Sequence, residues 1–332
     1  MTTQTAAIVN PLLNYGPDPW ALCHDGYFYY THSTQESLTI WKVKSFAELA
    51  DTPGKVAWKA PESGPFSSNV WAPELHYLDR GDGHKCWYAY LSASNAETLD
   101  SQRIWVLEND ACDPIDGGWA MKGQLVTPDD KWSIDGTVID LDGALYFAWS
   151  GWETDENHQQ NIYLCRMSNP WTCAGERLKL SSPTLPWEQH NYDAADPGNV
   201  RNRLLVNEAP AFLRHGDYLF IGYSASGCWT DYYAFGLLHA RIDSDLMKAA
   251  SWTKSQEPVF TSSPETDTYG PGHGCFFQTE SGQTWLLYHA NPRPNLGCEN
   301  ERTPRLQPIT WRPNGMPDFG VPQKEVAFDT GW

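Results

Sequence analysis

Three acidic residues recur at one position within repeated segments of this 332-residue chain: Asp18 in DPW, Asp135 in DGT and Glu208 in EAP. Carboxylates that converge raise one another's pKa, so such a cluster serves proton sharing or binding. Glycoside hydrolysis needs one acid to protonate the leaving oxygen and another carboxylate to activate water or attack the anomeric carbon. Taken singly, an acid before Pro or Gly is more often a turn residue. Three at equivalent positions favour catalysis.

Each acid begins a segment in which an apolar run meets a Gly or Asp turn and then an alternating aromatic run, a pattern typical of a β-hairpin. Five such segments begin at residues 17, 71, 134, 207 and 272. Similar segments at blade-like spacing predict an all-β, five-bladed β-propeller that forms a single domain over residues 1–332. A β-sandwich with long insertions is the alternative, but it gives no reason for five similar segments.

The composition restricts the ligand. Lys and Arg number 23 against 41 Asp and Glu, a net charge of −18 that would repel nucleic acid. No apolar run approaches the ~18 residues of a membrane span. Trp, Tyr and Phe number 17, 16 and 12, and rings beside carboxylates suit a neutral sugar. Most of these rings recur in the second strand of each hairpin, so their main role is predicted to be packing between blades.

The N-terminus and the cysteines indicate little about compartment. No signal peptide is visible, so we expect a cytoplasmic protein as the sequence stands, or a secreted one if the natural chain begins further upstream. Eight Cys contain no CxxC pair, which argues against structural zinc. They are free thiols or disulfides, and Cys165 with Cys173 is the pair to test for a bridge.

The segments GPDPW, VWAPELH, SIDGTV, NEAPAF and GPGHGCFF, in this order, resemble glycoside hydrolase family 43, whose members are five-bladed propellers. The likeness runs from about residue 14 to Trp311. It implies an inverting mechanism in which Asp18 is the general base and Glu208 the general acid. Asp135 then matches the acid that raises the pKa of the general acid and orients it.

The same resemblance suggests binding residues. Trp71 resembles the ring beside the terminal sugar, although it could equally be a blade-packing Trp. Arg302 resembles the arginine that contacts the sugar, with Arg305 as the competing choice. Phe66 and Trp149 could line the pocket, and Trp149 suits a core position equally well.

Two further positions concern the active face and the axis. Trp229 follows Ser-Gly-Cys in a loop that could present it on the active face. His273 is the fifth counterpart of the acids, and in many relatives an equivalent His binds a hydrated calcium ion or a water network. We therefore predict a bound species on the axis, with a structural calcium ion as the candidate, and no organic cofactor.

The flanking sequence, including KLSSPTLPWEQ and ERTPRLQPITW, looks most like exo-acting α-L-arabinofuranosidases. The predicted activity is release of arabinose from α-1,5-linked arabinan or arabino-oligosaccharides by a monomer. A β-xylosidase or endo-arabinanase of the same family is the alternative, followed by a non-catalytic sugar-binding propeller. The long stretch 181–206 could close one end of the cleft and so decide for exo action, or be a surface excursion.

Overall fold

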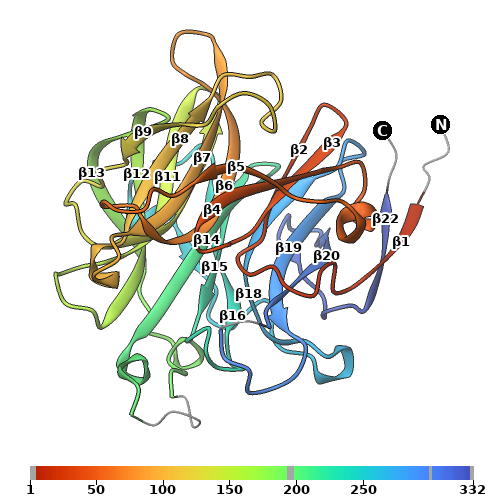
Figure 1. Cartoon of the computed structure of the whole chain (residues 1–332). Coiled ribbons are helices and arrows are strands. Elements are labelled where there is room, and N and C mark those ends of the chain that lie inside the picture. Colours follow the sequence, from red (N-terminus) through yellow and green to blue (C-terminus); the bar gives the residue numbers. More distant parts are fainter. Residues whose placement is uncertain (1–4, 193–197, 299–300, 330–332) are drawn as a thin grey trace.

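Five antiparallel four-stranded blades make up the computed structural model, which describes residues 5–192, 198–298 and 301–329 (Figure 1). Blades 1 and 2 comprise β2 (Trp20–His24), β3 (Tyr27–Thr31), β4 (Ser37–Val43), β5 (Lys55–Lys59), β6 (Ser68–Asp79), β7 (Lys85–Ser94), β8 (Arg103–Asn109) and β9 (Ala120–Gln124). Blade 3 comprises β10 (Ser133–Leu141), β11 (Ala144–Trp152), β12 (Gln159–Asn169) and β13 (Thr172–Ser181). Blades 4 and 5 comprise β14 (Leu205–His215), β15 (Tyr218–Ala225), β16 (Ala234–Arg241), β17 (Thr253–Lys254), β18 (Tyr269–Gln278), β19 (Thr284–Asn291), β20 (Thr303–Trp311) and β21 (Pro317–Asp318).

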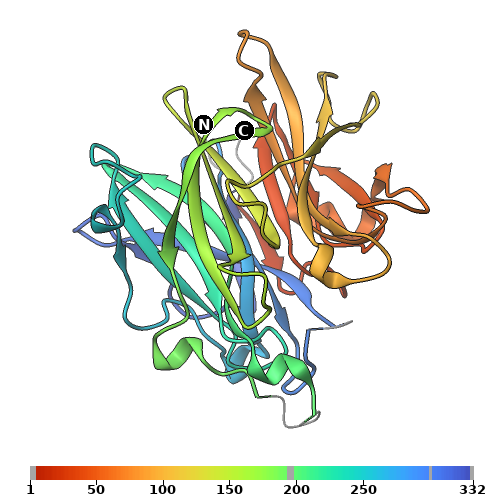
Figure 2. The ribbon, with the colours of Figure 1, turned by 90° about the vertical axis from the view of Figure 1, so that its left-hand side faces the viewer.

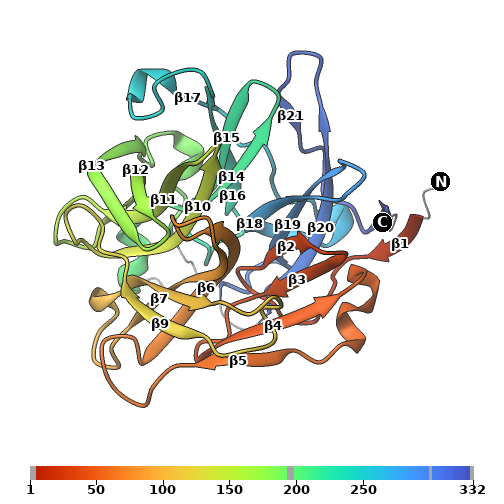
Figure 3. The same ribbon diagram turned by 90° about the horizontal axis from the view of Figure 1, so that it is seen from above.

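The first strands of the blades form a closed ring. They contact one another in the order β2, β6, β10, β14, β18 and back to β2, and Figure 3 shows them around a common centre with the later strands further out. In Figure 2 the red and orange blades 1 and 2 lie on one side and the green to blue blades 4 and 5 on the other. Closure of the ring confirms the predicted five-bladed propeller.

The core lies between neighbouring blades. Trp87, Trp149, Tyr223 and Trp285 are at most 1% exposed, and all four lie in the second strand of a blade. Both faces of that strand are covered by adjacent blades, so a continuous aromatic run replaces the alternation of a sheet with one wet face. The rings in these second strands therefore pack between blades, as predicted.

The two ends of the described chain pair with each other. Strand β1 (Thr5–Val9) is antiparallel to β22 (Glu325–Asp329) in a separate two-stranded sheet. The N-terminal strand is therefore not part of the last blade, where β21 is the outer strand. Asn10 links this sheet to blade 5 by donating to the Leu306 carbonyl and accepting from the Leu306 N–H, both at 2.8 Å.

In the part of the chain that the structure describes, helical structure is limited to short 3₁₀ segments. These are η1 (Phe46–Asp51), η2 (Leu99–Ser101), η3 (Pro186–Glu188), η4 (Val200–Arg203), η5 (Ala249–Ser251) and η6 (Pro264–Thr266). Among the described residues no helix has the length and apolar character to cross a membrane. Cys165 and Cys173 are thiols in this structure, and their Sγ atoms lie 3.0 Å apart on β12 and β13. A bridge between these two stays a prediction.

Candidate active site

Each blade carries a residue with left-handed backbone at an equivalent position of its inner strand, close to the site. These residues are Asp18, Ala72, Asp135, Ala209 and His273, with φ of 53°, 44°, 56°, 52° and 38°. In β6, β10, β14 and β18 the position coincides with a shift of strand register. Such a bulge re-aims side chains and is common beside active sites. The repeats therefore align on Ala72 and Ala209, not on Trp71 and Glu208, which come one residue earlier.

A polar side chain holds the N–H of each left-handed residue. In four blades the acceptor comes from the end of the second hairpin strand of the preceding blade. In blade 4 it is the carboxylate of Asp135. The bonds are Asp18 N–H to His289 Nδ1 at 3.0 Å, Ala72 to Ser33 Oγ at 2.7 Å, Asp135 to Ser92 Oγ at 3.0 Å, Ala209 to Asp135 Oδ2 at 3.0 Å, and His273 to Ser224 Oγ at 2.8 Å.

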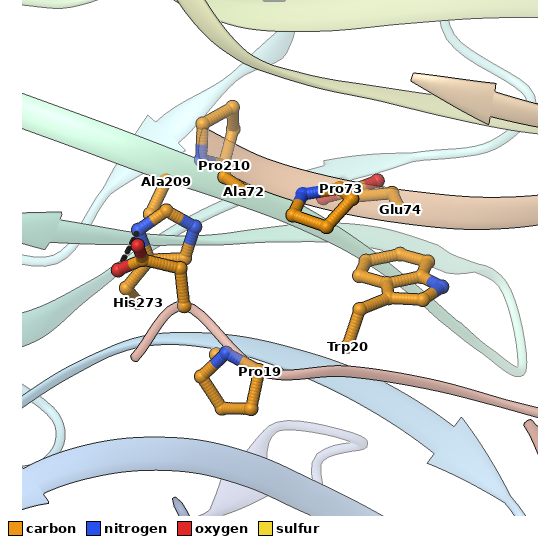
Figure 4. Close-up of a pocket in the computed structure, with 10 residues that line it drawn as sticks. Pro19, Trp20, Ala72, Pro73, Glu74, Ala209, Pro210 and His273 are labelled. Atoms are coloured by element: carbon orange, nitrogen blue, oxygen red, sulfur yellow. Dashed lines mark ion pairs between the residues drawn. The ribbon is translucent and has the colours of Figure 1, made fainter. Parts of the chain in front are cut away.

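Asp18 is a buried, ionised carboxylate. Arg302 Nη1 donates to its Oδ1 at 2.7 Å and Ser33 Oγ to its Oδ2 at 2.6 Å. His273 Nδ1 lies 3.2 Å from Oδ1, and the dashed line at His273 in Figure 4 marks this ion pair. Burial alone would raise the pKa of Asp18, but Arg302 and the neighbouring imidazoles hold this pKa well below its usual range. Burial also lowers the pKa of His273, so Arg302 is the positive charge that matters.

Asp135 and Glu208 are acids whose pKa values shift the other way. Burial, then the charges of Glu208 and Asp18, raise the pKa of Asp135 well above its usual range. Burial raises the pKa of Glu208 to about 7, assisted by Asp18 and opposed by Tyr233 and Arg302. Asp135 and Glu208 therefore compete for protons, and whichever keeps its charge raises the pKa of the other. Glu208 is the more exposed of the two, as proton transfer to a ligand requires.

The structure brings the three predicted acids and Arg302 together and separates the two candidate arginines. Arg302 contacts Asp18, whereas Arg305 is 2% exposed and donates to Thr268 and the carbonyl of Asp267. Arg305 thus anchors the turn before β18. The Nε of Arg302 is buried and has no hydrogen-bond partner among the described residues. A donor in this condition can bind a ligand oxygen.

Of the four predicted aromatic residues, Trp71 and Trp229 are half-buried. Trp71 is partly buried against Trp132 and Trp152, next to Ile134, and its Nε1 donates to Gln35 at 2.7 Å. Trp229 lies in the connection between β15 and β16, where its Nε1 donates to the Asn191 carbonyl at 2.7 Å.

The structure corrects the prediction for Trp149 and places Phe66 in a packing environment. Trp149 is 1% exposed and stacks between Phe147 and Tyr163, so a sugar has no access to it. Phe66 packs against Trp105, at 4.8 Å between ring centroids, and forms part of the core of blades 1 and 2. In a propeller both faces of a blade are covered, so an aromatic position in a strand is core by default.

His273 lines a small pocket together with Trp20 and Glu74 (Figure 4). Its Nδ1 is turned to Asp18, which Arg302 and Ser33 already bind. Within the described ranges no group of three or more His, Cys, Asp or Glu side chains could hold a metal ion. Calcium prefers several oxygen ligands. The side chains at this position do not make up such a set, and an axial calcium ion stays a prediction.

Four functional residues escaped the sequence reasoning: Ser33, Glu74, Tyr233 and His289. Glu74 is a fourth buried acid, and burial raises its pKa well above the usual range. Ser33 in THS lies just after the second strand of blade 1 and His289 in YHAN near the end of that of blade 5, and a polar residue lies near the end of that strand in the other blades as well. That recurrence is a sequence signal for the interblade hydrogen bonds. Tyr233 has no such signal.

The connection after blade 3 is anchored beside Glu208. Glu188, fully buried at its start, accepts from Asn207 Nδ2 at 3.1 Å and from Tyr223 at 3.0 Å, and pairs with Lys254 at 2.7 Å. Since Asn207 adjoins Glu208, this buried carboxylate joins the connection to the acid-bearing strand. Residues 193–197 of this connection fall outside the described residues.

Fold and site together define a five-bladed propeller with a carboxylate centre where its inner strands converge. The model of the glycosyl hydrolases family 43 matches residues 8–317. The chain belongs to this family.

Curated relatives and solved structures agree with this assignment. An extracellular exo-α-(1→5)-L-arabinofuranosidase of Streptomyces avermitilis is 35% identical over 327 residues, which are 96% of this chain and 64% of the relative. One of the same description from Streptomyces chartreusis is 36% identical over 85% of this chain and 81% of the relative. The crystal structure of an α-L-arabinofuranosidase from Lactobacillus brevis has a TM-score of 0.85 at 32% identity, covering 95% of this chain and 97% of that one. The chain thus spans less than two thirds of the Streptomyces avermitilis relative.

Proposed function

We propose that the protein is an inverting exo-α-L-arabinofuranosidase that releases arabinose from α-1,5-linked arabinan or arabino-oligosaccharides. The observation that carries this proposal is the opposite pKa shift of two acids at one site. Asp18 is held ionised by Arg302, while burial keeps Glu208 protonated up to about neutral pH. Acids whose environments separate their pKa values in this way suit a base and an acid.

In the proposed reaction Asp18 takes a proton from water as the water oxygen bonds to the anomeric carbon. The bond to the leaving oxygen breaks on the opposite face, and Glu208 gives its proton to that oxygen. Asp135 accepts a hydrogen bond from the Ala209 N–H, and its ionisation is coupled to that of Glu208 through their mutual repulsion. Regeneration requires Asp18 to lose a proton to solvent and Glu208 to regain one.

Three observations support the sugar and the exo mode. The relatives named above are described as acting on arabinofuranosides. The unpartnered Nε of Arg302 beside the base offers a donor to a sugar hydroxyl, and Trp71 offers a ring nearby. Glu188 ties the connection after blade 3 to Asn207, the residue before the acid, and Trp229 donates to the Asn191 carbonyl of that connection. A connection held next to the acid-bearing strand favours a substrate that enters by its end.

The test is product analysis on arabinan, arabinotriose and the 4-nitrophenyl glycosides of α-L-arabinofuranose and β-D-xylose. We expect arabinose as the product, with the anomeric configuration opposite to that of the cleaved bond by proton NMR. Faster cleavage of the xyloside would favour the β-xylosidase alternative, and early release of longer oligosaccharides would favour an endo-arabinanase. Binding without turnover would indicate a non-catalytic propeller.

The pH profile should follow the two shifted pKa values. Glu208 must be protonated to act as the acid, so kcat/KM should fall as pH rises through about 7. Asp18 must be ionised to act as the base, so activity is lost on the acid side only below the usual carboxylate range. Initial rates on arabinotriose across this range would check the profile. An alkaline decline that begins only far above neutral pH would contradict Glu208 as the acid.

A further inference from the structure

We propose that Tyr233 is a positioning residue of the general acid: its hydroxyl occupies one oxygen of Glu208, so that the transferable proton resides on the other. This inference rests on the proposed function, because it concerns the acid that protonates the leaving sugar. The Tyr233 hydroxyl donates to Glu208 Oε1 at 2.8 Å. An oxygen that accepts this bond is a poor place for the carboxyl proton, which leaves Oε2 to carry it.

Residues on two other strands, β18 and β19, hold the Tyr233 ring in place. Gly272 on β18 faces it so closely that a Cβ there would lie 1.9 Å from Tyr233 Cε1. His289 on β19 lies nearly parallel to the ring, at 5.9 Å between centroids and 10° between planes. Tyr233 itself is 1% exposed. Only glycine at 272 leaves room for the ring, so the hydroxyl is held at Glu208 by close packing.

The same contacts link the acid to the base. His289, which lies parallel to the Tyr233 ring, accepts the N–H of Asp18 at 3.0 Å. Ser224 accepts the N–H of His273, which lies 3.2 Å from Asp18. Tyr233 thus contacts Glu208 of blade 4 and His289 of blade 5, and His289 in turn binds Asp18, which precedes the first strand of blade 1. A tyrosine at this place fixes the position of the Glu208 carboxyl group relative to Asp18, and it also selects the oxygen of Glu208 that gives the proton.

The hydroxyl also acts on the ionisation of Glu208, in a direction that separates positioning from simple packing. A donor to the carboxylate favours the charged form, so it lowers the pKa that burial raises to about 7. Removing the hydroxyl must therefore raise this pKa. A residue needed only for packing would leave it unchanged.

The decisive variant is Tyr233→Phe, which removes one oxygen and keeps the ring. Its matched control is Tyr88→Phe, because Tyr88 donates to Glu108 at 2.8 Å in blade 2, away from the site. For Tyr233→Phe we expect the alkaline midpoint of kcat/KM to move up by about one pH unit. We also expect kcat on arabinotriose to fall ~10-fold or more. On the nitrophenyl arabinofuranoside it should fall less than about twofold, because that leaving group needs little protonation. Tyr88→Phe should match the wild type in all three.

A second readout does not depend on catalysis. In protein labelled with ¹³C at the glutamate carboxyl carbons, the Glu208 signal is the one that Glu208→Gln removes, and its titration midpoint should be higher in Tyr233→Phe. An unchanged midpoint, or equal losses on the two substrates, would overturn the positioning role. If the wild type cleaves neither substrate while the midpoint still moves, the proposed function fails and the coupling of Tyr233 to Glu208 stands.

Discussion

Replacing Glu208 by glutamine should reduce kcat on arabinotriose by about 10²- to 10⁴-fold, because the amide cannot give a proton to the leaving oxygen. Glutamine keeps the shape of the side chain and can still accept from Tyr233, so the packing at β14 is retained. The loss should be much smaller on a nitrophenyl arabinofuranoside, whose leaving group is weakly basic. Steady-state rates on the two substrates measure this difference directly.

Glu108→Gln is the control for this variant, since Glu108 also accepts from a tyrosine hydroxyl at 2.8 Å. It should be as active as the wild type on both substrates. Glu208→Gln with wild-type activity on arabinotriose would remove Glu208 from the reaction. An equal loss on both substrates would point to a binding or folding defect instead.

Replacing Asp18 by asparagine should reduce kcat by about 10²- to 10⁴-fold on both substrates, because water must be activated whichever group leaves. The amide keeps a left-handed backbone at this position, which asparagine adopts readily. It removes the charge opposite Arg302, and a buried cation without its partner destabilises the fold, by ~3–5 kcal/mol in comparable cases. Thermal unfolding should therefore accompany the rate measurements, which are made well below the transition.

Asp267→Asn is the matched control, because Asp267 has a φ of 51° and pairs with Lys324 at 2.7 Å, far out on the surface. It should retain both activity and melting temperature. A folded Asp18→Asn enzyme that keeps a tenth or more of the wild-type rate would exclude Asp18 as the base. Loss on arabinotriose alone would exchange the roles proposed for Asp18 and Glu208.

The propeller could be predicted because its signals are local. A hairpin depends on period-two alternation and on turn residues that tolerate positive φ, and both are visible within twenty residues. The three acids could be predicted for the same reason, since they recur within one residue of the same place in the repeats. Arg302 became distinguishable from Arg305 only in the structure, because one residue turns to the channel and the other to the turn before β18.

The alignment of the repeats could not be derived to the residue. Trp71, where the second repeated segment begins, and the acid Glu208 come one residue before the left-handed positions Ala72 and Ala209. A bulge inserts a residue into one strand, and in a strand that is covered on both faces the apolar pattern gives no sign of the insertion. The burial of Trp149 could not be predicted either, because a strand that is covered on both faces has aromatic residues on both faces.

By itself, the sequence determined that the protein consists of repeated hairpins with three acids near the start of inner strands. Hairpins and repeats can be recognised in this way because their signals depend on residues that are close together in the chain. Only the tertiary structure decided which acid is ionised. The pKa of Asp18 depends on Arg302, 284 residues away in the chain, and that of Glu208 on burial and on Tyr233. Charges and hydrogen bonds act through space at a few ångströms, and ring closure alone brings these partners together.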